Sequence, residues 1–78
     1  MKIIFNKNNL LFIQVAKEDY KIFSYQTLVA STHAGEVERC WDGWSATTAK
    51  HLNACLSYLG LEKISKKNWL TMPIMKGE

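Results

Sequence analysis

The fold is decided by residues 36–60, EVERCWDGWSATTAKHLNACLSYLG, in which a strand pattern gives way to a helix pattern. From Glu36 to Trp41 polar and apolar residues alternate, as they do in a strand with one solvated face. Because the alternation puts Arg39 on the same side as Val37 and Trp41, we expect that side to be incompletely buried. The pattern therefore predicts a strand at the edge of a sheet.

A helix is predicted over residues 46–59. Ser45 is placed to cap its first turn, and Gly60 is a usual stop after the last. Four apolar residues recur at helical spacing and should face the core: Ala49, Leu52, Leu56 and Leu59. We expect the opposite side to face solvent, with Lys50, Asn53 and Ser57, and a flank to be formed by His51, Cys55 and Tyr58.

The first half of the chain reads as strands, because β-branched and aromatic residues alternate with short polar clusters. The predicted strands are Lys2–Phe5 and Leu10–Val15, joined by a turn at Asn6–Asn9. Tyr20–His33 is longer than an average strand. We expect either a split near Ser24–Gln26 or a bulge that lets one bent strand pair with two neighbours.

A short second helix is predicted over residues 66–71, capped by Ser65 and ended by Pro73, with a loose tail after Met75. Strands come first and helices last, so the sequence predicts an α+β fold. In this fold an antiparallel sheet of three to five strands packs against the helix at about 46–59. We expect residues 1–78 to form one domain.

The charge is mildly basic, with a net charge of +3 and a pI near 9.0. This balance suits a soluble protein and is weak for a dedicated DNA-binding protein. The two cysteines are too few for a disulfide framework, and no apolar run approaches a membrane span or a secretory signal. The expected location is the cytoplasm, with no membrane contact.

The cysteines, histidines and carboxylates are the residues that could form a catalytic or metal site. His51 and Cys55 are the only close pair of candidate metal ligands, whereas zinc needs three or four. An enzyme that uses Cys55 with His51 is the catalytic alternative, but no orienting carboxylate lies nearby in sequence. Glu36 and Glu38 are better explained as solvated charges that protect an edge strand. We therefore expect no catalytic residue, no metal and no cofactor.

The strand-to-helix corner is the candidate binding site. Two tryptophans three residues apart bracket a turn, and hydroxyl side chains follow at a helix start, where free N–H groups attract anions. Aromatic residues are also frequent anchors of protein interfaces. The predicted partner-binding residues are Arg39, Trp41, Trp44, Ser45, Thr47, Thr48, Lys50 and His51.

A basic region near the C-terminus provides a second candidate, a nucleic-acid-binding module. Its contacts would be Lys50, Lys63, Lys66 and Lys67, close in sequence to Trp69. The alternative is that these lysines are solvated and that Trp69 belongs to the core.

Three segments carry a resemblance: residues 24–30 (SYQTLVA), 44–51 (WSATTAKH) and 65–67 (SKK). They resemble a pattern, SYxTxVA…WSxTTxKH…SKK, of short bacteriophage and prophage proteins that form a family of unknown function. The resemblance covers about residues 24–78, and its most specific part is WSxTTxKH. The chain departs from the pattern in Trp41, Cys40 and Cys55.

The resemblance implies a phage origin and carries over no catalytic residue. Small phage proteins often act by occupying a surface of a host protein. We therefore expect a non-enzymatic accessory protein that binds a host protein or protein complex in a bacterial cytoplasm. Inhibition of a defence system, such as a CRISPR or restriction complex, is the leading expectation. The oligomeric state, monomer or homodimer, is left open.

Overall fold

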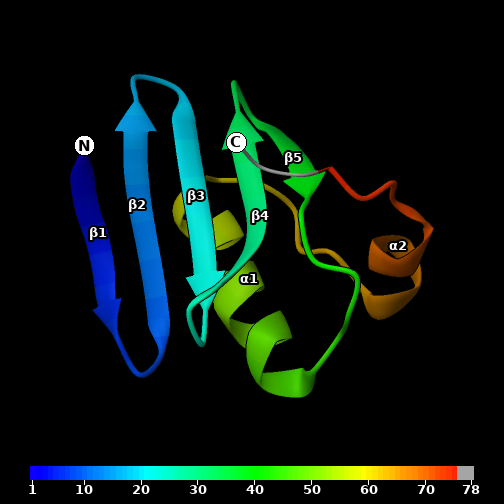
Figure 1. Ribbon diagram of the computed structural model, residues 1–78. Helices are drawn as coiled ribbons and strands as arrows, with labels where there is room; N and C mark the ends of the chain where they lie inside the picture. Colours follow the sequence, from blue (N-terminus) through cyan, green and yellow to red (C-terminus); the bar gives the residue numbers. More distant parts are fainter. Residues whose placement is uncertain (76–78) are drawn as a thin grey trace.

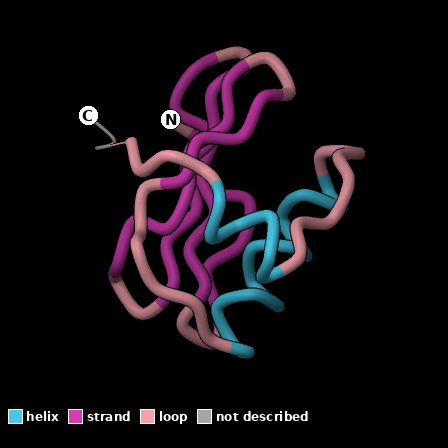
Figure 2. The backbone as a smooth tube through the Cα atoms, turned by 90° about the vertical axis from the view of Figure 1, so that its right-hand side faces the viewer, coloured by secondary structure: helices cyan, strands magenta, loops and turns pink. Residues whose placement is uncertain are grey.

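A computed structural model describes residues 1–75 and shows an antiparallel sheet (Figure 1) with both helices on one side of it (Figure 2). The strands lie in the sheet in chain order. They are β1 Lys2–Lys7, β2 Leu10–Ala16, β3 Asp19–Ser24, β4 Thr27–His33 and β5 Glu36–Arg39, and the helices are α1 Ala46–Tyr58 and α2 Lys66–Thr71. The predicted α+β fold is confirmed. The tail expected after Met75 lies outside the described residues.

Three two-residue turns join neighbouring strands through backbone with positive φ: Asn8-Asn9, Tyr25-Gln26 and Ala34-Gly35. Two consecutive residues of this kind match the twist of a hairpin. Asparagine and glycine adopt the conformation readily, whereas tyrosine and glutamine are strained in it. The turn predicted at Asn6–Asn9 is too long, because Asn6 and Lys7 continue β1 by pairing with β2.

The long segment Tyr20–His33 forms two strands that separate at Tyr25-Gln26, as the first alternative predicted. A register shift between Ile22 and Phe23 also places a bulge in the pairing of β3 with β4. This bulge does not produce one bent strand with two neighbours, so the chain follows the first alternative only.

Strand β5 lies at one edge of the sheet, as predicted, but it ends at Arg39 and not at Trp41. The expectation of an incompletely buried side is confirmed, because Val37 and Trp41 are half-buried, although Arg39 between them is only 5% exposed. Ile74 forms a parallel bridge with Arg39, and the Met75 N–H donates to the Arg39 carbonyl. A segment near the C-terminus therefore lies against the outer edge of β5.

Helix α1 begins after Ser45, whose side chain accepts a hydrogen bond from the Thr48 N–H, and Gly60 follows its end with φ of 74°. The predicted apolar stripe is displaced. The buried residues of α1 are Thr48, Leu52, Cys55 and Leu56. Ala49 and Leu59, which belong to the predicted stripe, are half-buried. Asn53, expected to face solvent, uses its amide to bond both the N–H and the carbonyl of Ile64.

Helix α2 confirms the predicted bounds, and the Ser65 side chain caps it by accepting from the Asn68 N–H. Its one buried residue is Trp69, as the alternative for this segment proposed. Within the described residues, no helix is long and apolar enough to cross a membrane.

The core lies between the sheet and the helices. Its fully buried members come from β2, β3, β4 and both helices, and burial of a Val, Leu, Ile or Phe side chain among them contributes about 1.5–3 kcal/mol. They are Phe12, Ile22, Val29, Ala30, Leu52, Cys55, Leu56 and Trp69.

Candidate functional site

The strand-to-helix corner predicted as the binding site turns largely inward. Trp41 and Trp44 are half-buried and pack against the core. Trp69 is 1% exposed, its ring centroid lies 6.4 Å from that of Trp44, and its Nε1 donates to the Gly43 carbonyl at 2.8 Å. A Cβ at Gly43 would lie 2.5 Å from the Trp41 ring, so this close approach requires glycine. The tryptophans therefore join the sheet to the helices.

Arg39 is the central polar group of the corner. Its guanidinium donates to the backbone carbonyls of Trp41, Asp42 and Met72 at 2.9, 2.8 and 3.0 Å. The same group lies 5.4 Å from the centroid of the Trp69 ring, within cation–π range. The side chain therefore ties β5 to the loop that follows it and to the end of α2, and it is not presented on the surface.

At the start of α1 the predicted site residues divide between surface and interior. Ser45, Thr47 and Lys50 are exposed, His51 is half-buried and Thr48 is buried. A partner at this corner would therefore meet the three exposed side chains.

A hydrogen-bonded cluster, not predicted from the sequence, joins β3 to α1. The buried Ser24 Oγ lies 2.8 Å from His51 Nδ1 and 3.1 Å from Thr48 Oγ1. The Tyr25 ring lies beside it, with its centroid 6.1 Å from that of His51, and Tyr25 is 55% exposed. The cluster therefore holds the strained Tyr25-Gln26 turn against the helix.

A sequence signal for this cluster existed. Ser24 and Tyr25 belong to the first segment of the motif pattern, and Thr48 and His51 belong to the second. The structure brings the two segments together although 24 residues separate Ser24 from Thr48. Reading the motifs as neighbours in space would have found the contact.

The Cys-His pair considered from the sequence receives no support from this geometry. Cys55 is fully buried, and burial raises the pKa of its thiol to about 12. His51 directs Nδ1 to Ser24. Within residues 1–75, no group of three or more His, Cys, Asp or Glu side chains could hold a metal ion.

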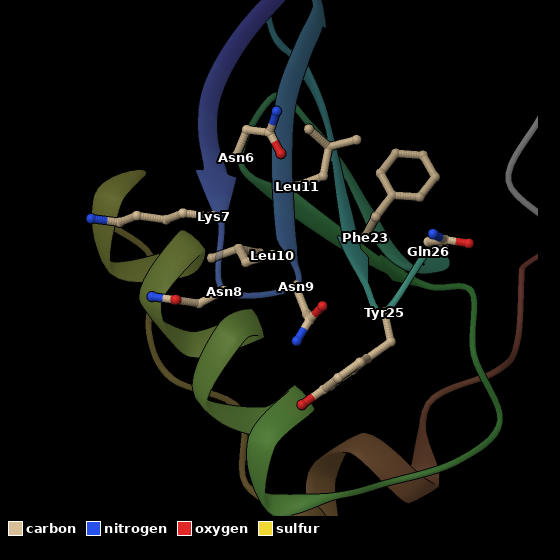
Figure 3. A pocket seen from close by; sticks show the side chains of 9 residues that line it. All are labelled: Asn6, Lys7, Asn8, Asn9, Leu10, Leu11, Phe23, Tyr25 and Gln26. Atoms are coloured by element: carbon tan, nitrogen blue, oxygen red, sulfur yellow. The ribbon is translucent and has the colours of Figure 1, made fainter.

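Hollows surround the tip of the β1–β2 hairpin. The one on the sheet side, of about 520 Å³, is called the tip hollow (Figure 3). It is lined by Asn6, Lys7, Asn8, Asn9, Leu10, Leu11, Phe23, Tyr25 and Gln26. A second of about 240 Å³, the hairpin–helix hollow, is lined by Phe5, Lys7, Asn8, Leu10, His51 and Ala54. Both are open surface depressions with polar side chains at their rims.

The predicted nucleic-acid contacts separate into two pairs. Lys50 and Lys63 line one depression on the outer side of α1, of about 600 Å³, called the outer hollow. It is completed by Ala49, Asn53, Ala54 and Ser57. Lys66 and Lys67 begin α2 and line none of these three hollows.

The sheet face opposite the helices, called here the open face, is half apolar and half acidic. The strand register gathers Leu11, Ile13, Phe23 and Leu28 on its apolar half. The acidic half carries Asp19, Glu36 and Glu38, and Lys21 lies among them with its Nζ donating to Ser31 Oγ at 3.3 Å. His33 contacts Asp19 there, and this hydrogen bond raises the pKa of the imidazole above 6.5.

Residues 2–71 match a family of unknown function, DUF8033. The chain belongs to this family. The predicted membership of a family of unknown function is confirmed, and the DUF8033 match extends from β1 to the end of α2, so it includes every helix and strand. No curated protein and no solved structure was found to match the chain.

Proposed function

We propose that this DUF8033 protein is a non-enzymatic accessory protein of a phage or prophage that inhibits a host protein by binding to it. The proposed target is a bacterial defence system, such as a CRISPR or restriction complex. The surface of the target that this chain covers would be apolar and surrounded by basic residues, as in a groove that binds nucleic acid.

The open face is the observation that carries this proposal. Leu11, Phe23 and Leu28 are half-buried there although neither helix covers them. An apolar patch of this kind is typical of protein-binding surfaces. The adjoining acidic half, with exposed Glu36 and Glu38, would be attracted to basic side chains around an apolar groove and would oppose acidic surfaces.

The burial of the two candidate nucleophiles favours a binding function over catalysis. The hydroxyl of Ser24, which contacts His51, belongs to a residue that is 3% exposed. The Cys55 thiol, one helical turn from His51, is fully buried. A substrate would have no access to either nucleophile. The phage origin rests on the motif pattern in residues 24–30, 44–51 and 65–67.

The test measures whether the chain protects a phage from a bacterial defence system. Strains with one CRISPR or restriction system each would express the chain and be challenged with a phage that the system targets. We expect plating to be restored in at least one strain, and the inhibited complex to co-purify with the chain. The double variant Glu36→Lys with Glu38→Lys should lose both effects, because the two reversed charges would repel a basic groove.

Glu62→Lys with Glu18→Lys is the matched control, since both residues are exposed, neither belongs to the open face as defined, and the charge change is the same. It should retain protection. Equal loss in both double variants, or no protection in any strain, would contradict the proposal.

A further inference from the structure

The three hollows form one continuous tract around the hairpin tip. The tip hollow and the hairpin–helix hollow share Lys7, Asn8 and Leu10. The hairpin–helix hollow and the outer hollow share Ala54. The tract therefore runs from the open face, past the end of the hairpin, to Lys63 beyond the outer side of α1.

The charged side chains that line this tract are all lysines. Lys7, Lys50 and Lys63 are exposed along it, and no Asp or Glu is among the residues that line the three hollows. The meander puts Glu18 and Glu36 at the opposite end of the sheet, in or beside the β2–β3 and β4–β5 turns. This separation attracts an anionic ligand to the tract.

One end of the tract offers an aromatic ring among side-chain amides. Tyr25 is 55% exposed at the rim of the tip hollow, and its turn has positive φ at a residue that rarely adopts it. Strain of this kind clusters at binding and catalytic sites. Asn8, Asn9 and Gln26 are exposed amides that line the same hollow (Figure 3), and amides of this kind pair well with the edges of bases.

We propose that the tract binds single-stranded nucleic acid. The three lysines contact successive phosphates, Tyr25 stacks on an unpaired base, and the amides around it meet the base edge. A duplex would keep its bases stacked and could not use Tyr25 in this way. The tip hollow shares Leu11 and Phe23 with the apolar half of the open face, whereas the lysines, Tyr25 and the amides do not belong to the open face as defined, so the two proposals are tested at separate residues.

The test is fluorescence anisotropy with labelled 20-nucleotide single strands of mixed sequence, as DNA and as RNA, and with the matching DNA duplex. Three phosphate contacts predict a slope of about −2 for log affinity against log salt, or about 20-fold weaker binding at 200 mM than at 50 mM NaCl. Either single strand is expected to bind more tightly than the duplex.

Variants identify the contacts. Lys50→Ala with Lys63→Ala should reduce the slope to about −0.7. Lys66→Ala with Lys67→Ala removes the same charge from exposed residues off the tract and should leave the slope unchanged. Tyr25→Ala should weaken binding roughly 5- to 150-fold with no change of slope. Circular dichroism would verify that each variant is folded.

Three results would overturn the inference: no binding of either single strand at 50 mM NaCl, tighter binding of the duplex, or equal losses in the two double lysine variants. The Glu36→Lys with Glu38→Lys variant should bind the single strand at least as well as the parent chain, because its changes lie off the tract. A parent chain that binds single strands but restores plating in no strain would refute the proposed function alone, whereas a parent chain that restores plating but binds neither single strand would refute this inference alone.

Discussion

Replacing Arg39 with methionine should remove a large part of the stability of the domain. The side chain is 5% exposed and donates to three backbone carbonyls, those of Trp41, Asp42 and Met72. These hydrogen bonds are part-buried, so each carbonyl that loses its donor should cost about 1 kcal/mol, the low end of the 1–3 kcal/mol range for a buried acceptor. Methionine retains part of the packing and removes the desolvation of a charge, so we expect a net loss near the lower bound for three acceptors, about 3 kcal/mol.

The scale of this loss follows from the size of the chain. A 78-residue domain has a free energy of unfolding of about 4–12 kcal/mol at 0.05–0.15 kcal/mol per residue. With a urea dependence of about 1 kcal/mol per molar, the unfolding midpoint should fall by about 3 M. Trp69 reports the transition by fluorescence, since its ring is buried beside the guanidinium.

Two further variants sharpen the test. Arg39→Lys keeps the charge but not the planar fork of donors, so its stability should lie between those of the parent and the methionine variant. Lys67→Met removes an exposed charge and should change stability by no more than about 0.5 kcal/mol. A midpoint for Arg39→Met within about 0.5 M of the parent value would refute the idea that the guanidinium holds the corner together.

The remaining predictions concern a thiol, a turn and a histidine. Cys55 should react with a thiol reagent only when the protein unfolds, because burial raises its pKa to about 12; fast labelling of the native protein would contradict this. Replacing Tyr25-Gln26 with Asn-Gly should raise stability by about 1–2 kcal/mol in thermal melts by relieving positive-φ strain, and a lower melting temperature would show that the turn is unstrained. Asp19→Asn should lower the raised pKa of His33 toward 6.5 in an NMR titration. The pair contributes its stability below pH 6.5 and loses it as the pH rises through the raised pKa, so a titration curve left unchanged by Asp19→Asn would exclude the contact.

Local signals predicted the elements well. Ser45 and Ser65 cap their helices as expected, and Gly60 takes the positive φ expected of a helix stop. Each signal depends on neighbours within about four residues, so the sequence contains all the information needed. For the same reason the order of strands and helices sufficed to predict the α+β class.

The errors arose where distant residues decide the outcome. The buried side of α1 differs from the predicted stripe because Thr48 is buried with a hydrogen bond to the hydroxyl of Ser24. Ser24 belongs to β3, and the periodicity of α1 carries no information about that strand. The burial of Arg39 itself cannot be predicted from the local pattern, because its acceptors include the carbonyl of Met72, which lies 33 residues away. Buried polar groups depend on partners that come from elsewhere in the chain.

The strand order has a consequence for how the chain folds. Every strand of the meander pairs with the next one in sequence, so the sheet is built from local hairpins that close short loops. Such hairpins form without waiting for distant segments, and the first 39 residues contain the whole sheet. Its inner apolar face nevertheless lacks a cover until α1 and Trp69 arrive. During synthesis the growing chain therefore passes through a stage in which all five strands are present but the half of the chain that covers their inner face is not, and shielding from aggregation is most needed at that stage.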